Sequence, residues 1–288
     1  MKKITVSKAI GEALHEEMLR DDKVFIMGED MAVMGNVFAI TKGFLEEFGP
    51  KRVIDTPISE EGFVGMAVGA AMRGMRPVVE LMYDDFATEC ADPLFNQAAK
   101  IRYMTGGQCH VPMVLRAPMG AGRRNAGQHS QSLENFFCHF PGLKVVAPCT
   151  AQDAKGLLKS AIRDDDPVIF LEHKLLYAHK EQIPEEEYTI PLGQADIKRE
   201  GKDITIITWS REVNFSLEAA KTLAEQGIDA EVLDLRTLVP LDWDAIVQSV
   251  SKTHNAIIVS EEVKRGSFAG ELSAQIAEEL FDELDAPV

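Results

Sequence analysis

Short runs of consecutive apolar residues alternate along this chain with segments whose apolar residues recur every three or four positions. The uninterrupted apolar runs predict buried strands. In the first part of the chain they lie at 24–27, 52–54, 77–82, 113–115, 143–146 and 168–171. Because apolar residues occupy consecutive rather than alternate positions, these strands are typical of a parallel sheet covered on both faces.

The segments between these runs predict helices. Their apolar spacing and capping residues place helices at about 7–20, 63–71, 93–103 and 151–163. Ser7 would cap the first of them and Thr150 the last. Strands and helices in alternation predict an α/β fold with right-handed crossovers.

The composition changes after Leu176. Residues 177–203 contain two prolines and the run Glu185-Glu186-Glu187, which is typical of an exposed linker. A second α/β unit follows, with strands at 204–208, 230–233 and 256–260 and helices at about 213–226, 243–252 and 268–284. We therefore expect two domains, 1–176 and 204–288, each with a mostly parallel sheet flanked by helices. Pro287-Val288 resembles the entry to another strand, so the second domain is expected to be incomplete at its end.

The charge of the chain limits the classes of partner that it could bind. The chain has 30 Lys and Arg against 46 Asp and Glu, a formal net charge of −16. Such a protein repels nucleic acid and anionic lipid, whereas a basic protein partner would suit it. The sequence has no apolar run long enough to span a membrane and no signal-peptide pattern at its start. Its four cysteines lack CxxC spacing, which favours reduced thiols and a cytoplasmic location.

Several familiar motifs are absent. Residues 120–125 partly resemble a phosphate-binding glycine loop, but Asn125 stands where the third glycine belongs. No P-loop, HExxH or GxSxG sequence occurs, and the histidines lack metal-ligand spacing with the cysteines. We therefore expect neither a dinucleotide site nor a zinc site.

Three segments could carry chemistry: the first two directly follow predicted strands, whose carboxyl ends bind ligands in α/β folds, and the third has a histidine among small polar residues in a loop. They are 55–63 with Glu60, 80–86 with its aromatic and acidic residues, and 127–132 with His129. Each also has a structural interpretation: Glu60 would complement a helix dipole, the aromatic residues would belong to the core, and His129 would be an ordinary loop residue. The residues alone leave both interpretations open.

Six stretches, in order along the chain, resemble one family. The chain is similar to the β subunits of thiamine-diphosphate-dependent 2-oxo acid and acetoin dehydrogenase complexes, which are transketolase-like. The matching stretches are Ile26-Met27-Gly28-Glu29-Asp30, Asp55-Thr56-Pro57-Ile58-Ser59-Glu60, Asn96-Gln97-Ala98-Ala99-Lys100, Gln128-His129-Ser130-Gln131-Ser132, Pro141-Gly142-Leu143-Lys144-Val145-Val146 and Asp153-Ala154-Lys155-Gly156-Leu157-Leu158. The resemblance favours the functional interpretation of Glu60 and His129.

The resemblance implies an architecture and partners. Residues 1–176 would be a pyrimidine-binding domain, 177–203 a linker, and 204–288 a transketolase C-terminal domain that is truncated at its end. Two such chains would assemble with two α subunits, bind thiamine diphosphate at the α–β interface, and serve a lipoyl-bearing acyltransferase core. The α subunit would hold magnesium and the diphosphate through a Gly-Asp-Gly motif, which this chain lacks.

The resemblance also assigns site residues. The pyrimidine ring would lie against Glu29, Ile58, Ser59, Glu60, Met82 and Phe86. Glu60 would hydrogen-bond ring nitrogen N1′ and favour the tautomer whose 4′-nitrogen removes the thiazolium proton, and His129 would be the second catalytic residue. Tyr83, Asp84, Asp85 and His129 would line the substrate side. Some members bind potassium, which here would involve Met113, Ala161, Ile162, Asp164 and Asp166.

The function that the resemblance implies is cleavage of pyruvate or acetoin and transfer of the two-carbon unit to lipoamide, an oxidoreductase activity. The sequence of residues 188–201 favours these substrates over branched-chain 2-oxo acids. Two alternatives are a fragment of a stand-alone transketolase-like enzyme and a non-catalytic acidic scaffold subunit. The first would need a diphosphate-binding motif in the same chain, and the second leaves Glu60 and His129 without a role.

Overall fold

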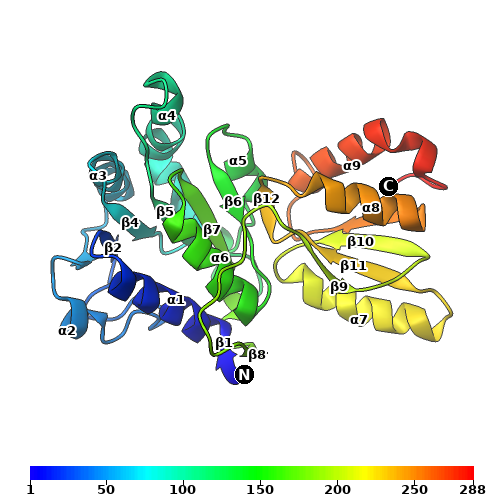
Figure 1. The fold of residues 1–288 in the computed structure, drawn as a ribbon, viewed down its shortest axis with the longest axis horizontal. Coiled ribbons are helices and arrows are strands. Elements are labelled where there is room, and N and C mark those ends of the chain that lie inside the picture. Colours follow the sequence, from blue (N-terminus) through cyan, green and yellow to red (C-terminus); the bar gives the residue numbers. More distant parts are fainter.

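The computed structural model describes residues 1–288 and has two lobes (Figure 1). In the first lobe, one seven-stranded sheet has the strand order β12-β6-β7-β5-β4-β2-β3. Its strands are β2 (Val24–Gly28), β3 (Val53–Asp55), β4 (Arg76–Glu80), β5 (Val114–Met119), β6 (Lys144–Val146), β7 (Val168–His173) and β12 (Thr237–Val239). All neighbours are parallel except β12 and β6. The parallel sheet predicted from the apolar runs is therefore confirmed.

Helices cover both faces of this sheet. The helices of the lobe are α1 (Val6–Arg20), α2 (Phe44–Phe48), α3 (Glu60–Met72), η1 (Asp84–Cys90), η2 (Asp92–Ala98), α4 (Ile101–Met104), η3 (Gly127–His129), α5 (Glu134–Cys138), α6 (Ala151–Arg163) and η4 (Lys174–Leu176). Alternate residues of β2 face opposite ways: Val24 and Ile26 pack in the core under α1 and α6, whereas Phe25 and Met27 pack in the core under α3. Consecutive apolar residues are needed because both faces are buried.

The second lobe has a four-stranded sheet of order β13-β10-β11-β9, in which only β9 is antiparallel to its neighbour. Its elements are β9 (Asp196–Arg199), β10 (Ile204–Thr208), α7 (Glu212–Glu225), β11 (Ala230–Asp234), α8 (Trp243–Thr253), β13 (Ala256–Val259), α9 (Phe268–Glu279) and η5 (Phe281–Glu283). The α3-side core of the first lobe continues into this one through residues such as Trp209 and Leu235. The lobes therefore pack directly on one another.

Three local predictions differ from the structure. Residues 177–203 include β8 (Lys180–Ile183), which pairs with β1 (Lys2–Thr5), as well as β9, so this segment is not a uniformly exposed linker. Thr5 rather than Ser7 caps α1, because its hydroxyl accepts the amide hydrogen of Lys8. The helix predicted at 93–103 is divided into the π-helical η2 and the short α4.

The structure contains neither a membrane-spanning helix nor a disulfide bond. No helix is both long enough and apolar enough to cross a membrane. All four cysteines are free thiols, as their spacing predicted.

Candidate active site

Four adjacent strands deliver the predicted site residues to one edge of the first sheet. Neighbours in the order β5-β4-β2-β3 run parallel, so their carboxyl ends lie together. Glu29 follows β2, Glu60 follows β3, the segment 82–86 follows β4, and His129 lies in the loop after β5. Parallel pairing thus gathers groups that are 100 residues apart in the sequence.

Glu29 and Glu60 form an acidic pair at this edge. Glu29 is only 7% exposed, and its Oε1 is buried without a hydrogen-bond partner. Burial, followed by the negative charges of Glu60 and Asp30, raises the pKa of Glu29 to about 7. Glu60, at the first position of α3, is partly exposed. The pair therefore combines a carboxyl that holds a proton near neutral pH with one that an incoming group can reach.

The helix η1 connects this pair with the rest of the site. Phe86 lies near its start, and Cys90 is its last residue. Burial and then the charge of Glu60 raise the pKa of the buried Cys90 thiol to about 12. α3, which begins at Glu60, packs against η1, the helix that carries Phe86.

His129 lies between two aromatic rings. Its ring centroid is 4.6 Å from that of Tyr83 and 5.4 Å from that of Phe86, and both pairs are edge-on. Asn125 donates a hydrogen bond of 3.2 Å to the Tyr83 hydroxyl, and the buried Lys174 ammonium lies 5.3 Å from the Tyr83 ring centroid. The imidazole is thus fixed in orientation but is only half-buried.

Asp84 and Asp85 follow Tyr83 in the chain and bind the segment after His129. Asp84 accepts the amide hydrogen of Leu133, and Asp85 accepts from the Gln131 side chain at 2.8 Å. Both side chains are buried, and burial together with the neighbouring Asp85 raises the pKa of Asp84 well above its usual value. In this chain the two carboxyls therefore hold the segment that carries His129.

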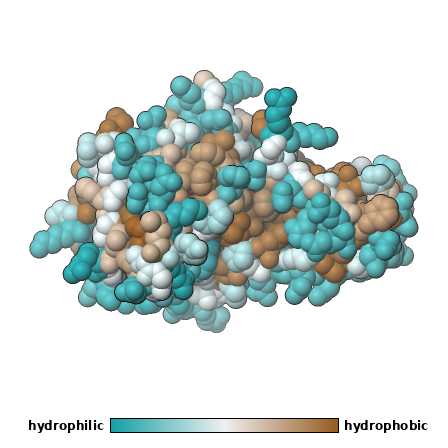
Figure 2. Space-filling view, turned by 90° about the horizontal axis from the view of Figure 1, so that it is seen from above, coloured by the Kyte–Doolittle hydropathy of each residue, from teal (hydrophilic) through white to brown (hydrophobic).

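The remaining predicted contacts lie at an open margin. Ile58 is 84% exposed, Ser59 is exposed, and Met82 is half-buried. Three more apolar side chains of the loop after β2 are also exposed: Val33, Met34 and Val37. A cleft of about 660 Å³ lies elsewhere, between α4 and the segment around Pro240, and of the predicted site residues only Asp166 lines it. In Figure 2 apolar surface spreads between the lobes on the face seen from above.

The oxygens named for potassium have protein partners. Arg76 donates to the carbonyls of Ile162 and Asp164, at 3.1 and 2.8 Å. The Met113 carbonyl accepts from Val168, and that of Ala161 from Asp164. The carboxylates of Asp164 and Asp166 pair with Lys144 and Arg102. This donor set does not fit a cation cage, because guanidinium and ammonium groups already supply the positive charge.

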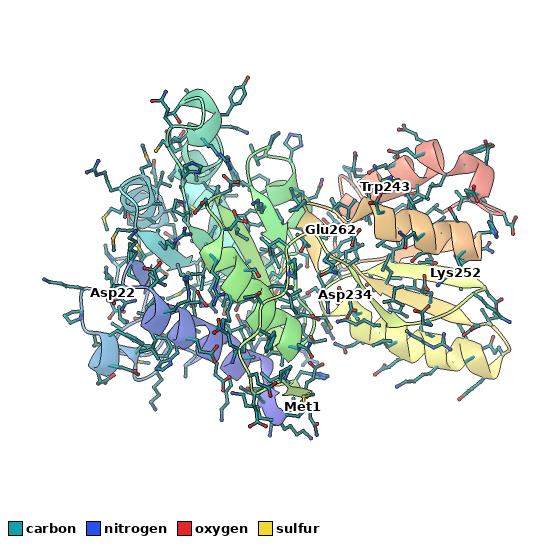
Figure 3. All side chains as sticks on the ribbon, viewed as in Figure 1. Met1, Asp22, Asp234, Trp243, Lys252 and Glu262 are labelled. Atoms are coloured by element: carbon teal, nitrogen blue, oxygen red, sulfur yellow. The ribbon has the colours of Figure 1, made fainter.

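Sequence reasoning missed three buried polar residues around the site. Asn36 binds the side chain of Glu80, Lys174 lies behind Tyr83, and Glu134 accepts from the Trp209 indole at 3.1 Å. Burial and then the charge of Glu262 raise the pKa of Glu134 to about 8. Glu262 lies on the edge of the second lobe that faces the first (Figure 3). No local pattern in the sequence marks these contacts, since each joins residues at least 44 positions apart.

Family models match both lobes. Residues 2–180 match the pyrimidine-binding domain of transketolase, and residues 193–288 match the transketolase C-terminal domain. Together with the acidic pair at the sheet edge, these matches define a transketolase-like protein of the thiamine-diphosphate enzymes. The predicted fold class is thereby confirmed.

Curated relatives narrow this class. The chain is 52% identical to the pyruvate dehydrogenase E1 component subunit beta of Rickettsia felis, and the match covers 99% of this chain and 87% of the relative. It is 50% identical to the acetoin:2,6-dichlorophenolindophenol oxidoreductase subunit beta of Bacillus subtilis, covering 99% and 87%. Its identity to the 2-oxoisovalerate dehydrogenase subunit beta of that bacterium is 48%, covering 97% and 86%. The chain belongs to this family of dehydrogenase β subunits, as the resemblance of its motifs indicated.

A solved structure supports the fold. A split-gene transketolase, described as an inactive beta4 tetramer, superposes with a TM-score of 0.80 at 22% identity and covers 96% of this chain and 86% of that one. At this identity the likeness concerns the fold alone. The three relatives differ by only a few per cent in identity, so they do not by themselves separate pyruvate from acetoin or 2-oxoisovalerate.

Proposed function

We propose that this chain is the β subunit of a thiamine-diphosphate-dependent dehydrogenase that cleaves pyruvate or acetoin and passes the two-carbon unit to lipoamide. The observation that carries the proposal is the buried, unpartnered Oε1 of Glu29 beside the accessible Glu60. Such an oxygen is costly to bury without a partner, and a pyrimidine nitrogen or amine would supply one. The half-buried Met82 and Phe86 provide apolar surface for the ring nearby.

The chain's own residues have distinct roles in this proposal. Thiamine diphosphate, when bound, supplies the nucleophilic carbon and the electron sink. Glu60 would hydrogen-bond N1′ of the aminopyrimidine and favour its reactive tautomer, and Glu29, whose pKa burial raises to about 7, would place less negative charge beside the ring than an ordinary carboxylate. His129, held between Tyr83 and Phe86, moves or holds a proton at the substrate oxygen. Tyr83 forms the substrate-side wall, whereas Asp84 and Asp85 hold this wall from beneath.

The exposed apolar side chains at the edge of the first sheet indicate a protein partner. Ile58, Val33 and Met34 leave apolar surface around a site that needs to exclude water. An α subunit covers this margin and brings the diphosphate and magnesium ligands, in an assembly of two α and two β chains. A lipoyl-bearing acyltransferase core then receives the product. The carbonyls of Ile162 and Asp164 already accept hydrogen bonds from Arg76, so we assign no potassium ion to them.

Substitution of Glu60 tests the mechanism in the assembled enzyme. The chain is co-produced with an α subunit that carries a Gly-Asp-Gly motif, and turnover of pyruvate and of acetoin is measured with lipoamide as acceptor. Glu60→Gln should lower kcat about 100- to 10,000-fold, since it removes the group that controls the tautomer. Assembly, followed by size-exclusion chromatography, should be unchanged.

The neighbouring Glu61 provides a matched control. It is exposed one position further along α3, so Glu61→Gln makes the same chemical change outside the acidic pair and should keep normal turnover. Near-normal activity of Glu60→Gln would contradict the mechanism. Turnover of neither pyruvate nor acetoin by the wild-type assembly, together with turnover of 2-oxoisovalerate, would support the branched-chain alternative.

A further inference from the structure

One asparagine joins the loop after β2 to the buried centre of the sheet. Asn36 is buried, and its amide nitrogen donates to both carboxylate oxygens of Glu80, at 2.9 and 2.8 Å. Its amide oxygen accepts the backbone N–H groups of Phe38 and Ile40. The side chain of Asn36 therefore acts as donor and acceptor at once, and its bond to Glu80 joins residues 44 positions apart in the sequence.

The backbone around Asn36 is shaped for this contact. Gly35 and Asn36 both adopt left-handed conformations, with φ of 75° and 64°. A side chain at Gly35 would lie 2.6 Å from the backbone of Lys42, so only glycine fits there. Asparagine tolerates the left-handed region better than most residues. The sequence Gly-Asn thus permits a turn that aims the amide inward.

The anchor of this contact is a closed ring of buried groups. Glu80 accepts from Arg116 at 2.6 Å, Arg116 also binds Glu172 at 2.7 Å, and the Tyr177 hydroxyl donates to Glu172 at 2.7 Å. The Tyr177 ring then packs edge-on against Phe38, 4.8 Å between centroids, which brings the chain of contacts back to the same loop. Arg116 is 0% exposed, so this ring is a rigid part of the core.

The loop that Asn36 holds begins at the candidate site. Asn36 donates its own backbone hydrogen to the carbonyl of Asp30, the residue next to Glu29, at 2.8 Å. Glu80, its other partner, ends β4 two positions before Met82. Asn36 therefore contacts both the segment that carries Glu29 and the strand end that leads to the apolar wall.

We infer that Asn36 is a positioning residue, which fixes Glu29 against Glu60 by clamping the 29–43 loop to the Glu80–Arg116 ring. The inference rests on the proposed function only in that the site it positions is the pyrimidine site. Loss of the clamp lets the loop relax and water reach Glu29, so the prearranged pair is lost without any change in the groups that touch the cofactor. Asn36 itself makes no contact with reacting atoms.

Two substitutions of Asn36 separate the clamp from the backbone. Asn36→Gly keeps the left-handed turn but removes the amide. Asn36→Asp keeps the acceptors for Phe38 and Ile40 but cannot donate to Glu80 while ionised. In the assembly with the α subunit, both should raise the Kd for thiamine diphosphate about tenfold or more. Calorimetric titration of thiamine diphosphate with magnesium measures this.

A second readout uses the full chain without cofactor. Titration of the glutamate side chains by ¹³C NMR, with Glu29→Gln to assign the resonance, should show that the pKa of Glu29 falls towards its ordinary value in Asn36→Gly. Ala39→Gly is the matched control, because Ala39 is an exposed residue of the same loop with a φ of 57°. It adds the same flexibility and should leave both the Kd and the Glu29 titration unchanged.

The outcomes are distinguishable. If Asn36→Gly and Ala39→Gly behave alike in both measurements, the clamp is refuted. If Asn36→Gly does not fold, Asn36→Asp decides through its Kd, and a wild-type value there refutes the clamp. If the wild-type assembly binds no thiamine diphosphate, the proposed function fails, whereas the Glu29 titration in Asn36→Gly still decides whether Asn36 positions that carboxyl.

Discussion

Two acidic regions of this molecule shift the pKa values of their carboxyl groups in opposite directions. Along the seam between α1 and α6, Glu16 binds Lys155 and Lys159 at 2.5 and 2.8 Å. Although burial acts to raise the pKa of Glu16, the hydrogen bonds from these lysines lower it. At the candidate site, burial raises the pKa of Glu29, and no cation contacts it.

The difference in pairing distinguishes carboxylates that stabilise the fold from carboxyls at the candidate site. A carboxylate paired with lysine stabilises the fold in its charged form, whereas an unpaired, buried carboxyl costs stability whenever it ionises. Glu134 is another buried carboxyl without a cation beside it. It lies where the first lobe meets the second, and its pKa is raised to about 8. Carboxyls of this second kind occur at the candidate site and also in the second lobe, where burial raises the pKa of Glu212 to about 7, so they identify a site only together with its geometry.

The two regions should therefore lose stability at opposite ends of the pH scale. Groups with raised pKa, such as Glu134 and Glu29, bind more protons in the folded state than in the unfolded one. Their contribution is fully present below about pH 4 and is lost as pH rises through their folded pKa values of about 8 and 7. Glu16, with a lowered pKa, contributes above its unfolded pKa and loses this as pH falls through its folded value.

Chemical denaturation of the isolated chain across pH measures this first and largest effect. From about pH 5 to pH 8 the free energy of unfolding should fall by on the order of 3 kcal/mol. Glu134→Gln should flatten this alkaline decline and leave the loss at acid pH unchanged, because the amide keeps an acceptor for Trp209 but cannot ionise. A decline as steep in Glu134→Gln as in the wild type would contradict the assignment.

Removing a cation from the seam should have the next largest effect. The Lys155 side chain is almost fully buried and joins Glu12 and Glu16. Lys155→Ala should lower the free energy of unfolding at pH 7 by about 2 kcal/mol, since it removes both packing and charge pairing. Lys8→Ala on the exposed side of α1 is the control and should change it little. Equal effects of the two substitutions would mean that the seam pairs are not stabilising.

The same contrast explains what the sequence could predict. The strands of the first sheet follow from apolar runs, because burial on both faces leaves a local signature, as in Val24–Gly28. β12 leaves none: Thr237–Val239 is short and joins the sheet of the other lobe only because β6 presents a free edge there. β9 has no apolar run either, since three of its four residues are charged, and the sequence therefore predicts a linker there.

The candidate site divides in a similar way. Glu29, Glu60 and His129 were found through stretches of consecutive residues that resemble a family. Asn36, Arg116 and Glu134 were not, since their partners lie in other strands and the other lobe. A sequence reveals groups that act on a ligand sooner than the groups that hold them, because the latter are defined by contacts between distant segments.

Helix capping offers the smallest test of the contrast. At the start of α6, in the scaffold, the Thr150 hydroxyl accepts the Asp153 amide hydrogen at 3.0 Å. At the start of α3, in the candidate site, Ser59 occupies the cap position but makes no such bond. Thr150→Ala should therefore lower the free energy of unfolding by about 1 kcal/mol, and Ser59→Ala should leave it nearly unchanged. Both are measured by urea denaturation of the isolated chain. A cost for Ser59→Ala equal to that for Thr150→Ala would show that the start of α3 is capped like that of α6, contrary to the contrast.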